Sequence, residues 1–152
     1  MDRCLESSLG ELMKSASTIV ANYLIGVASF STPGGVGTWP LYKNSMPEVT
    51  VNCGCLYDTT PVGEGKTMAG SYTQHYGLQL GVRATVCDDG YEKLDTVATA
   101  LDLVHNATVA IGGDTYTILS FTRATSIILL EQDEKRRYIH ELNLVVSIRK
   151  EY

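Results

Sequence analysis

Two stretches of alternating apolar residues constrain the fold of this chain more than any other feature of its sequence. Every second residue is apolar between positions 76 and 87, and the pattern returns between positions 138 and 150. A period of two is that of a β-strand with one buried face. The inward-facing residues are then Leu78, Leu80, Val82, Ala84 and Val86 in the first stretch and Leu142, Leu144, Val146 and Ile148 in the second. The sequence therefore predicts a core built on a β-sheet.

Shorter patterns predict four further strands. Residues 48–57 alternate, and we expect this strand to pair with the one at 76–87. A glycine-rich turn and a charged tip separate the other strands, as in hairpins. The predicted ranges are 48–57, 109–111, 115–121 and 126–131, and the buried face of the first holds Val49, Val51, Cys53, Cys55 and Tyr57.

Two segments have the three- and four-residue spacing of amphipathic helices. The first runs from about residue 9 to residue 25, and Ser8 and Glu11 have the spacing of a capping box at its start. The second follows Asp88-Asp89-Gly90, whose carboxylates can accept hydrogen bonds from the first amides of a helix, and ends near His105. Its predicted core face consists of Leu94, Val97, Ala98, Leu101 and Val104.

Composition and the lack of a dividing linker indicate one domain. The chain has 152 residues, 44% of them hydrophobic, and a mean hydropathy of zero, which is ordinary for a globular domain with its own core. No internal repeat or linker divides it. Residues 1–152 are therefore predicted to form a single α+β domain, a mainly antiparallel β-sheet packed against two amphipathic helices. Long loops are expected at about residues 27–47 and 58–75, where proline or glycine gathers.

The charge of the chain argues against one class of function. Its formal net charge is −5 and its pI is about 5.1. Proteins that wrap DNA neutralise phosphates with basic residues, so an acidic chain is not expected to hold nucleic acid. The apolar run at residues 17–30 is too short to span a membrane and follows helical spacing, so no membrane contact or export is expected.

The four cysteines are expected to be reduced thiols in a cytoplasm, because a chain of this length needs no disulfides. Cys53 and Cys55 could form half of a metal site. No second pair of ligands at suitable spacing completes it, and the alternation places both among buried apolar residues. No metal and no cofactor are therefore expected. Cys4 and Cys87 complete the set.

The segment Gly-Glu-Gly-Lys-Thr at residues 63–67 raises the possibility of a phosphate-binding loop. That loop needs a glycine where this chain has Thr60, and Pro61 removes one of the amides that would cradle the phosphates. It also needs a helix after Thr67, and the residues that follow are poor helix formers. An exposed loop is the preferred prediction, and a nucleotide hydrolase using Lys66 and Thr67 stays as an alternative.

A second alternative from the enzyme class uses a thiol. Cys87 could pair in space with His75, His105 or His140, as in thiol hydrolases. Nothing local favours this reading, because no family signature surrounds the cysteine. His140 shares its predicted strand face with apolar residues, where a histidine is more often a core or interface residue than a ligand.

The charged cluster at residues 131–137 has two readings. It is either a solvated hairpin tip or a subunit contact in which alternating charge fixes orientation and register. The same two readings apply to the predicted loop at residues 58–75, which carries Glu64 and Lys66.

The order of the predicted elements and several motifs resemble one known family. The motifs are LYDT at residues 56–59, HYGLQLGVRA at 75–84, DDGYEKLDTVATALDLV at 88–104 and DEKRRYIHELNLVVSI at 133–148. Together they resemble the tail-terminator or minor capsid proteins of long-tailed bacteriophages, over most of residues 9–150. A glycine is common among the basic residues near the start of the last motif in that family, whereas this chain has none there. The residues that carry the resemblance are Gln79, Arg83, Asp89, Tyr91, Asp133, Glu134, Arg136 and Asn143.

The resemblance implies a structural virion protein and not an enzyme. Six copies would form a homo-oligomeric ring that caps the tail tube, binds the tail tube protein and joins it to the head-completion or connector protein. Viral DNA would pass through the lumen only as transient cargo. The protein would lie in the neck of the virion, at the top of the tail, after assembly in the host bacterial cytoplasm. A ring of one protein requires a heterologous interface, in which two different surfaces meet.

No catalytic residue is expected under this reading, and the predicted contact residues fall into two groups. The charged tip would contact a neighbouring subunit or a partner, and the loop at residues 58–75 would reach a neighbouring ring or the lumen. Another ring of the head-to-tail joint, such as a head-completion or tail-tube protein, is the alternative within the same class. The predicted contact residues are Glu64, Lys66, Asp133, Glu134, Lys135, Arg136 and Arg137.

Overall fold

A computed structural model describes residues 14–27, 30–33, 39–48, 52–66 and 72–151. These residues form a seven-stranded sheet in the order β1-β2-β3-β7-β5-β4, with β6 pairing beside β7. All neighbours are antiparallel except β1 and β2. The predicted α+β class with a mainly antiparallel sheet and two helices is confirmed. The strands are β1 Leu41–Lys43, β2 Cys53–Lys66, β3 Tyr72–Ala84, β4 Ala107–Ile111, β5 Asp114–Arg123, β6 Ile128–Gln132 and β7 Tyr138–Glu151.

The two strands with the clearest alternation, β3 and β7, pair with each other at the centre of the sheet. Leu78 lies opposite Leu144, and Leu80 lies opposite Leu142. Because the alternating positions of both strands face the same side, they form one continuous apolar surface. The inward-facing residues predicted from Leu78 to Ala84 and from Leu142 to Ile148 are all buried. The prediction for Val86 is wrong: it is 51% exposed, because β3 ends at Ala84.

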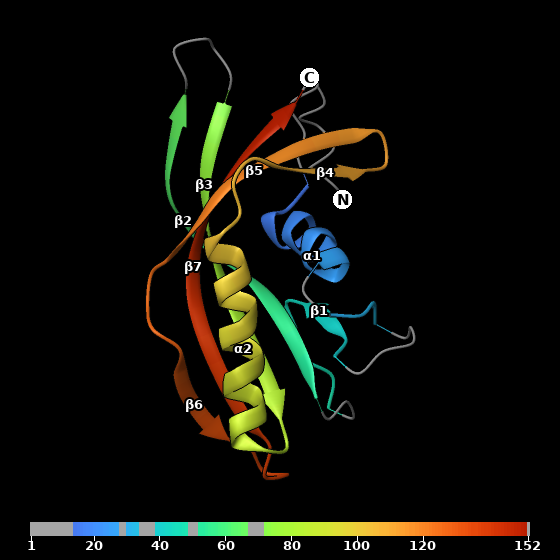
Figure 1. Ribbon diagram of the computed structural model, residues 1–152, viewed down its shortest axis with the longest axis vertical. Coiled ribbons are helices and arrows are strands. Elements are labelled where there is room, and N and C mark those ends of the chain that lie inside the picture. Colours follow the sequence, from blue (N-terminus) through green and yellow to red (C-terminus); the bar gives the residue numbers. More distant parts are fainter. Residues whose placement is uncertain (1–13, 28–29, 34–38, 49–51, 67–71, 152) are drawn as a thin grey trace.

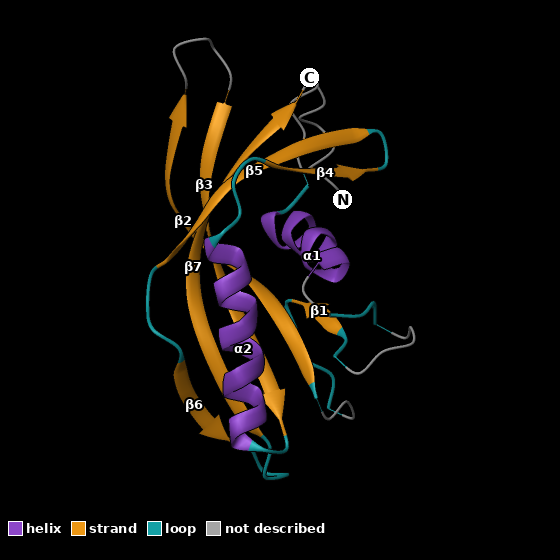
Figure 2. Cartoon of the chain, in the orientation of Figure 1, coloured by secondary structure: helices purple, strands orange, loops and turns teal. Residues whose placement is uncertain are grey.

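The two helices cover one face of the curled sheet. Helix α1, Ala16–Val27, packs between β1 and β4, and α2, Cys87–Asp102, lies along β3 and β7 (Figures 1 and 2). The predicted core face of α2 is buried in full. The helix ends three residues before the predicted His105, because the amide of Leu103 bonds to the carbonyl of Ala100 and closes the last turn. Within the described residues, no helix is long and apolar enough to cross a membrane.

The start of α1 is bound by a side chain from the sheet. The Ser17 amide donates to Asp58 Oδ1 at 2.9 Å, and the Ser17 hydroxyl donates to Asp58 Oδ2 at 2.6 Å. Asn44 Nδ2 adds a third bond to Oδ2 at 3.1 Å. A carboxylate at this end of a helix satisfies a free amide and complements the helix dipole. The predicted start of this helix at residue 9 is too early, since Lys14 and Ser15 lie outside the helix and its first turn closes on the carbonyl oxygen of Ser15. The predicted capping box of Ser8 and Glu11 lies outside the described residues.

The prediction of a loop over residues 58–75 is wrong in its extent. β2 continues to Lys66, β3 begins at Tyr72, and the two remain paired up to that point, with an irregularity between Thr59 and Gly63. The glycines of β2 have low strand propensity, but the β3 side of the ladder is rich in tyrosine and threonine, and pairing overrides local propensity. The result is a hairpin arm, formed by the outer halves of β2 and β3, in which β3 stays paired with β7 up to Thr73 (Figure 1).

The loop predicted at residues 27–47 contains one short strand, β1, and an isolated bridge between Ser31 and Pro40. Trp39, in this segment, packs against the core. The ammonium group of Lys93 lies 4.6 Å from the ring centre of Phe30 and 5.4 Å from that of Trp39. These cation-π contacts connect the segment to α2.

Cys53 and Cys55 are buried as predicted, but on the face of the sheet opposite the helices. Gly54 and Leu56 of the same strand face the helices instead, and Gly54 lies against the ring of Phe30. The cysteines are covered by residues 44–48, which we call the strap and which pass from β1 over the outer face. Burial raises the pKa of both thiols. Val49 and Val51, predicted on the same face, lie outside the described residues.

Candidate assembly surfaces

The charged tip between β6 and β7 is a tight turn organised by Asp133. Its carboxylate accepts from the amides of Lys135 at 3.0 Å and of Arg137 at 2.9 Å. Burial opposes ionisation of Asp133, but these bonds and the Arg137 guanidinium outweigh it and lower the pKa of the carboxyl group. Arg136 has φ of 62°, a left-handed conformation that favours glycine.

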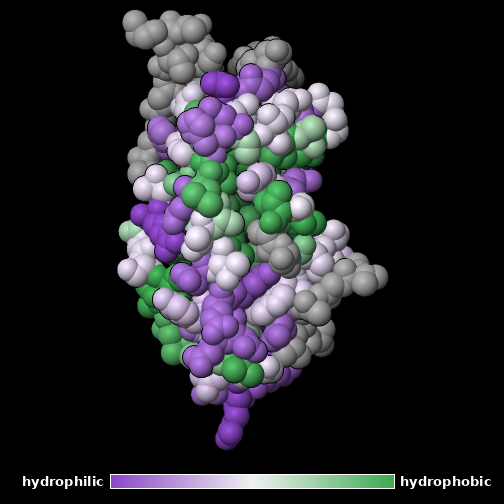
Figure 3. All heavy atoms as spheres, viewed as in Figure 1, coloured by the Kyte–Doolittle hydropathy of each residue, from purple (hydrophilic) through white to green (hydrophobic). Residues whose placement is uncertain are grey.

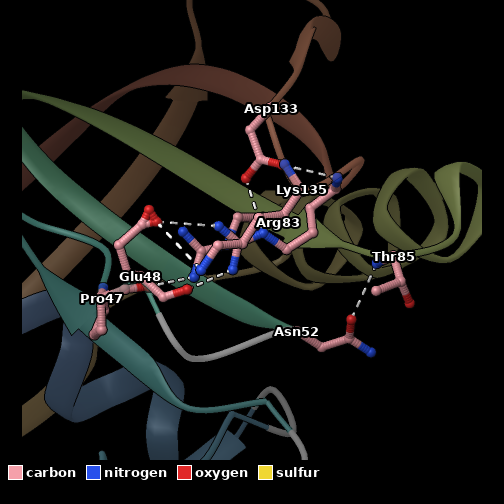
Figure 4. Close-up of polar contacts among 8 residues, drawn as sticks. Pro47, Glu48, Asn52, Arg83, Thr85, Asp133 and Lys135 are labelled. Carbon is pink, nitrogen blue, oxygen red and sulfur yellow. Dashed lines mark hydrogen bonds and ion pairs between the residues drawn. The ribbon is translucent and has the colours of Figure 1, made fainter.

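Two arginines in and beside the tip are buried and bind the strap (Figure 4). Arg137 Nε donates to Asp133 Oδ2 at 2.8 Å, and its Nη1 donates to the carbonyl oxygen of Glu48 at 2.6 Å. Arg83, from β3, donates to the carbonyl oxygen of Pro47. Buried guanidinium groups persist in proteins when carboxylates and carbonyls compensate them. Asp133 and Arg137, predicted as partner contacts, therefore make contacts within the subunit.

The other three residues of the predicted tip contact are exposed. Glu134, Lys135 and Arg136 project from the turn. Lys135 reaches only a loose ion pair with Glu48, at 3.9 Å. Exposed pairs of this kind contribute little to stability. These three side chains are therefore available to another molecule.

Glu64 and Lys66, the other predicted contact residues, lie near the end of the hairpin arm. Their backbone pairs with β3, Glu64 opposite Gln74 and Lys66 opposite Tyr72. Side chains from Thr60 to Tyr72 lie outside the part of the structure that is described. The arm and the tip lie at opposite ends of the molecule in Figure 1, so the structure does not bring the two predicted groups together.

A surface that the sequence analysis missed lies on β6. Ile128, Leu129 and Leu130 are 48%, 50% and 51% exposed. They are consecutive, so apolar side chains line an edge strand that pairs on one side only. Figure 3 shows apolar atoms along this edge of the molecule. The sequence did contain one sign of this surface. A strand with one buried face alternates apolar and polar residues, whereas residues 128–130 are all apolar.

A shallow groove runs beside the start of β6. Its volume is about 530 Å³, and it lies between α2, which contributes Tyr91 and Asp95, and the segment from Arg123 to Ile127. Arg123 is held by Asp102 of α2, at 2.8 Å between Nη2 and Oδ2. The groove and the apolar edge are therefore neighbouring parts of one surface.

The structure brings together one of the three thiol and histidine pairs considered above. Cys87 Sγ lies 3.9 Å from His140 Nε2, while Nδ1 of His140 is buried without a hydrogen-bond partner. Burial lowers the pKa of His140, so the imidazole is neutral at pH 7. Thiol hydrolases orient the base with a third group bound to its other nitrogen, and His140 has none among the described residues.

The metal and nucleotide readings have no supporting geometry. The described residues contain no group of three or more histidine, cysteine, aspartate or glutamate side chains that could hold a metal ion. In a phosphate-binding loop, a helix begins at the lysine. Here Lys66 ends one strand and the next begins at Tyr72.

Comparisons with known proteins give distant structural similarities. No protein-family model matches the chain, and no curated protein matches it in sequence. A chain from the virion of a native gene transfer agent particle is similar in structure at 14% identity, with a TM-score of 0.41, over 90% of this chain and 87% of that one. A second solved chain is similar at 15% identity, with a TM-score of 0.42, over 92% of this chain and 98% of that one.

Proposed function

We propose that this chain is a structural virion protein of a long-tailed bacteriophage. Six copies form a ring that caps the tail tube and joins it to the head-completion or connector protein. DNA passes through the lumen of the ring without being held, in keeping with the net charge of −5. The ring lies in the neck of the virion and is assembled in the host cytoplasm. The role is one of assembly, with no chemical step.

The observation that carries this proposal is that four of the eight residues responsible for the family resemblance take part in two polar groups that join distant segments of the chain. Gln79 Nε2 lies 3.4 Å from Asn143 Oδ1 and donates to Glu141 at 2.9 Å. Arg83 and Asp133 belong to the group that binds the strap. Residues that are distant in sequence thus support one fold, which explains why these residue types would recur together.

The exposed charges of the tip and the hairpin arm are the proposed contacts of the ring. Glu134, Lys135 and Arg136 face solvent on one end of the molecule, and the arm with Glu64 and Lys66 extends from the other. Surfaces at two ends suit a ring that stands between two different partners. Alternating charge at such contacts fixes orientation and register.

The deciding experiment is to image intact particles and locate the chain. Density for the chain between the tail tube and the connector supports the proposal, and mature virions that lack the polypeptide overturn it. A position within the tube or at the portal would favour another ring of the joint.

A charge reversal tests the tip. Lys135→Glu with Arg136→Glu should yield particles with defective tails while the purified subunit keeps its melting temperature. Thr99→Glu, an exposed change on α2, is the matched control and should assemble normally. Normal tails in the double variant would remove the tip from the proposed contacts.

A further inference from the structure

Two edge strands of the sheet contain none of the residues that commonly protect an edge against pairing. β4 and β6 have five residues each, and within the described residues each pairs on one side only. Edge strands are commonly protected by lysine or proline. Neither strand contains one of these residues. β6 has a bulge between Leu129 and Glu131, but the extra residue is the half-exposed Leu130.

The side chains of the two edges are complementary in size. β6 presents the large residues Ile128, Leu129 and Leu130. The exposed residues of β4 are the small Thr108 and Ala110, while Val109 between them points into the core. Large apolar side chains pack well against a neighbouring strand whose exposed positions are small.

The positions of the edges prevent them from meeting within one molecule. β6 lies at the lower left of Figure 1 and β4 at the upper right, on the other side of the helices. A contact between them therefore joins two copies through different surfaces. Such a contact is heterologous. In a pair of copies, one copy keeps a free β4 edge and the other keeps a free β6 edge, so further copies can add until a ring closes.

Antiparallel pairing would also fill the groove beside β6. The end of β4 would then lie next to the start of β6, which places the turn of Gly112 and Gly113 from one copy at the groove of the other. That turn is exposed and has no side chain beyond hydrogen, and an added Cβ at either glycine meets open space. The groove of about 530 Å³ has room for it.

We infer that β6 of one copy pairs with β4 of the next, with the turn at Gly112 and Gly113 seated in the groove between α2 and residues 123–127. The inference rests on the proposed ring and names the surfaces that close it. The backbone hydrogen bonds of the added strand and burial of the β6 side chains stabilise the contact. The occupant of the apolar edge is thus a second copy of this chain.

Blocking each edge separately tests the inference. Leu129→Lys blocks β6 and Ala110→Lys blocks β4, while Thr96→Lys, on the flank of α2 away from the groove, is the charge-matched control. By native mass spectrometry of concentrated protein, wild type and control should form rings, and each blocked variant alone should be a monomer. Mixed in equal amounts, the two blocked variants should form a dimer with one copy of each, because one intact interface remains. Rings from either blocked variant, no mixed dimer, or a monomeric wild type would overturn the inference.

A cross-link tests the geometry. In a background of Cys4→Ser and Cys87→Ser, Gly113→Cys on one copy and Ser126→Cys on another should form a disulfide under mild oxidation. The pair Gly113→Cys and Thr96→Cys, with Thr96 on the flank of α2 away from the groove, should react at least tenfold less. Equal yields would contradict the antiparallel arrangement. These outcomes are independent of where the chain lies in a particle, so failure of the interface and failure of the proposed function can be distinguished.

Discussion

At the scale of single residues, Asp58 has the clearest role, because one carboxylate connects three segments of the chain. It accepts hydrogen bonds from Ser17 and Asn44, so it joins α1 and the strap to β2. Sequence patterns could not identify it, since the cap of a helix was sought next to the helix and this one comes from 41 residues away.

Asp58→Ala should destabilise the domain by about 1–2 kcal/mol, since it removes a helix cap and leaves the Ser17 amide without its acceptor. Urea unfolding followed by circular dichroism measures the change. Asp58→Asn keeps one acceptor oxygen and should lose less. An unchanged midpoint for the alanine variant would show that the cap does not contribute.

Glu141 gives the fold a dependence on pH. Burial raises the pKa of its carboxyl group, and Glu131 adds repulsion. A raised pKa means that the folded state favours the protonated carboxyl group. The stabilising effect of this group is therefore complete below its pKa in the unfolded state and is lost as pH rises through its pKa in the folded state. Glu141→Gln removes the penalty and can still accept from Gln79. We expect a melting temperature higher by about 1–3 °C at pH 7 and no gain near pH 3. A gain of equal size at both values would contradict this cause.

At the scale of elements, the strap buries one face of β2 in a way that the sequence pattern did not predict. The alternation at residues 76–87 and 138–150 predicted the two central strands, because each has one face on a continuous core. The same reasoning placed Cys53 and Cys55 on that core, although they lie on the other face. Their burial depends on a loop that crosses the sheet, and a contact of that kind leaves no periodic signal in a sequence.

The hairpin arm and the apolar edge of β6 were missed for related reasons. Glycine and proline at residues 58–66 indicated a loop, but pairing with β3 holds them in a strand. The run from Ile128 to Leu130 was predicted as strand without its exposure, since burial depends on what lies beside a strand. Of the predicted tip contacts, Arg137 could not be told from Arg136 by composition, because only the fold turns one inward.

Arg137→Ala should release the strap. It removes the bonds to Asp133 and to the carbonyl oxygen of Glu48, so the free energy of unfolding should fall. The thiols of Cys53 and Cys55 should then react with a thiol reagent much faster than in wild type, since local opening exposes them. Arg136→Ala is the control and should stay within about 0.5 kcal/mol. Unchanged thiol reactivity in Arg137→Ala would show that Arg137 does not hold the strap in place.

At the scale of the whole molecule, stability should be highest along β7. This strand is paired on both sides, with β3 along one edge and with β5 and β6 along the other. By hydrogen exchange, amides at residues 140–148 should exchange last and only through global unfolding, while those of the edge strand β6 exchange earlier. Faster exchange in β7 than in β6 would contradict this order.

The place of β7 in the sheet also has a consequence for synthesis. A ribosome releases residues in chain order, so β3, α2 and β5 emerge before residues 138–151, the strand that lies between β3 and β5. Until then the apolar faces of both neighbours have no central strand to join them, and exposed apolar surface of this kind promotes aggregation of a nascent chain. The sheet, and therefore any assembly that uses it, can be completed only after translation has passed residue 151.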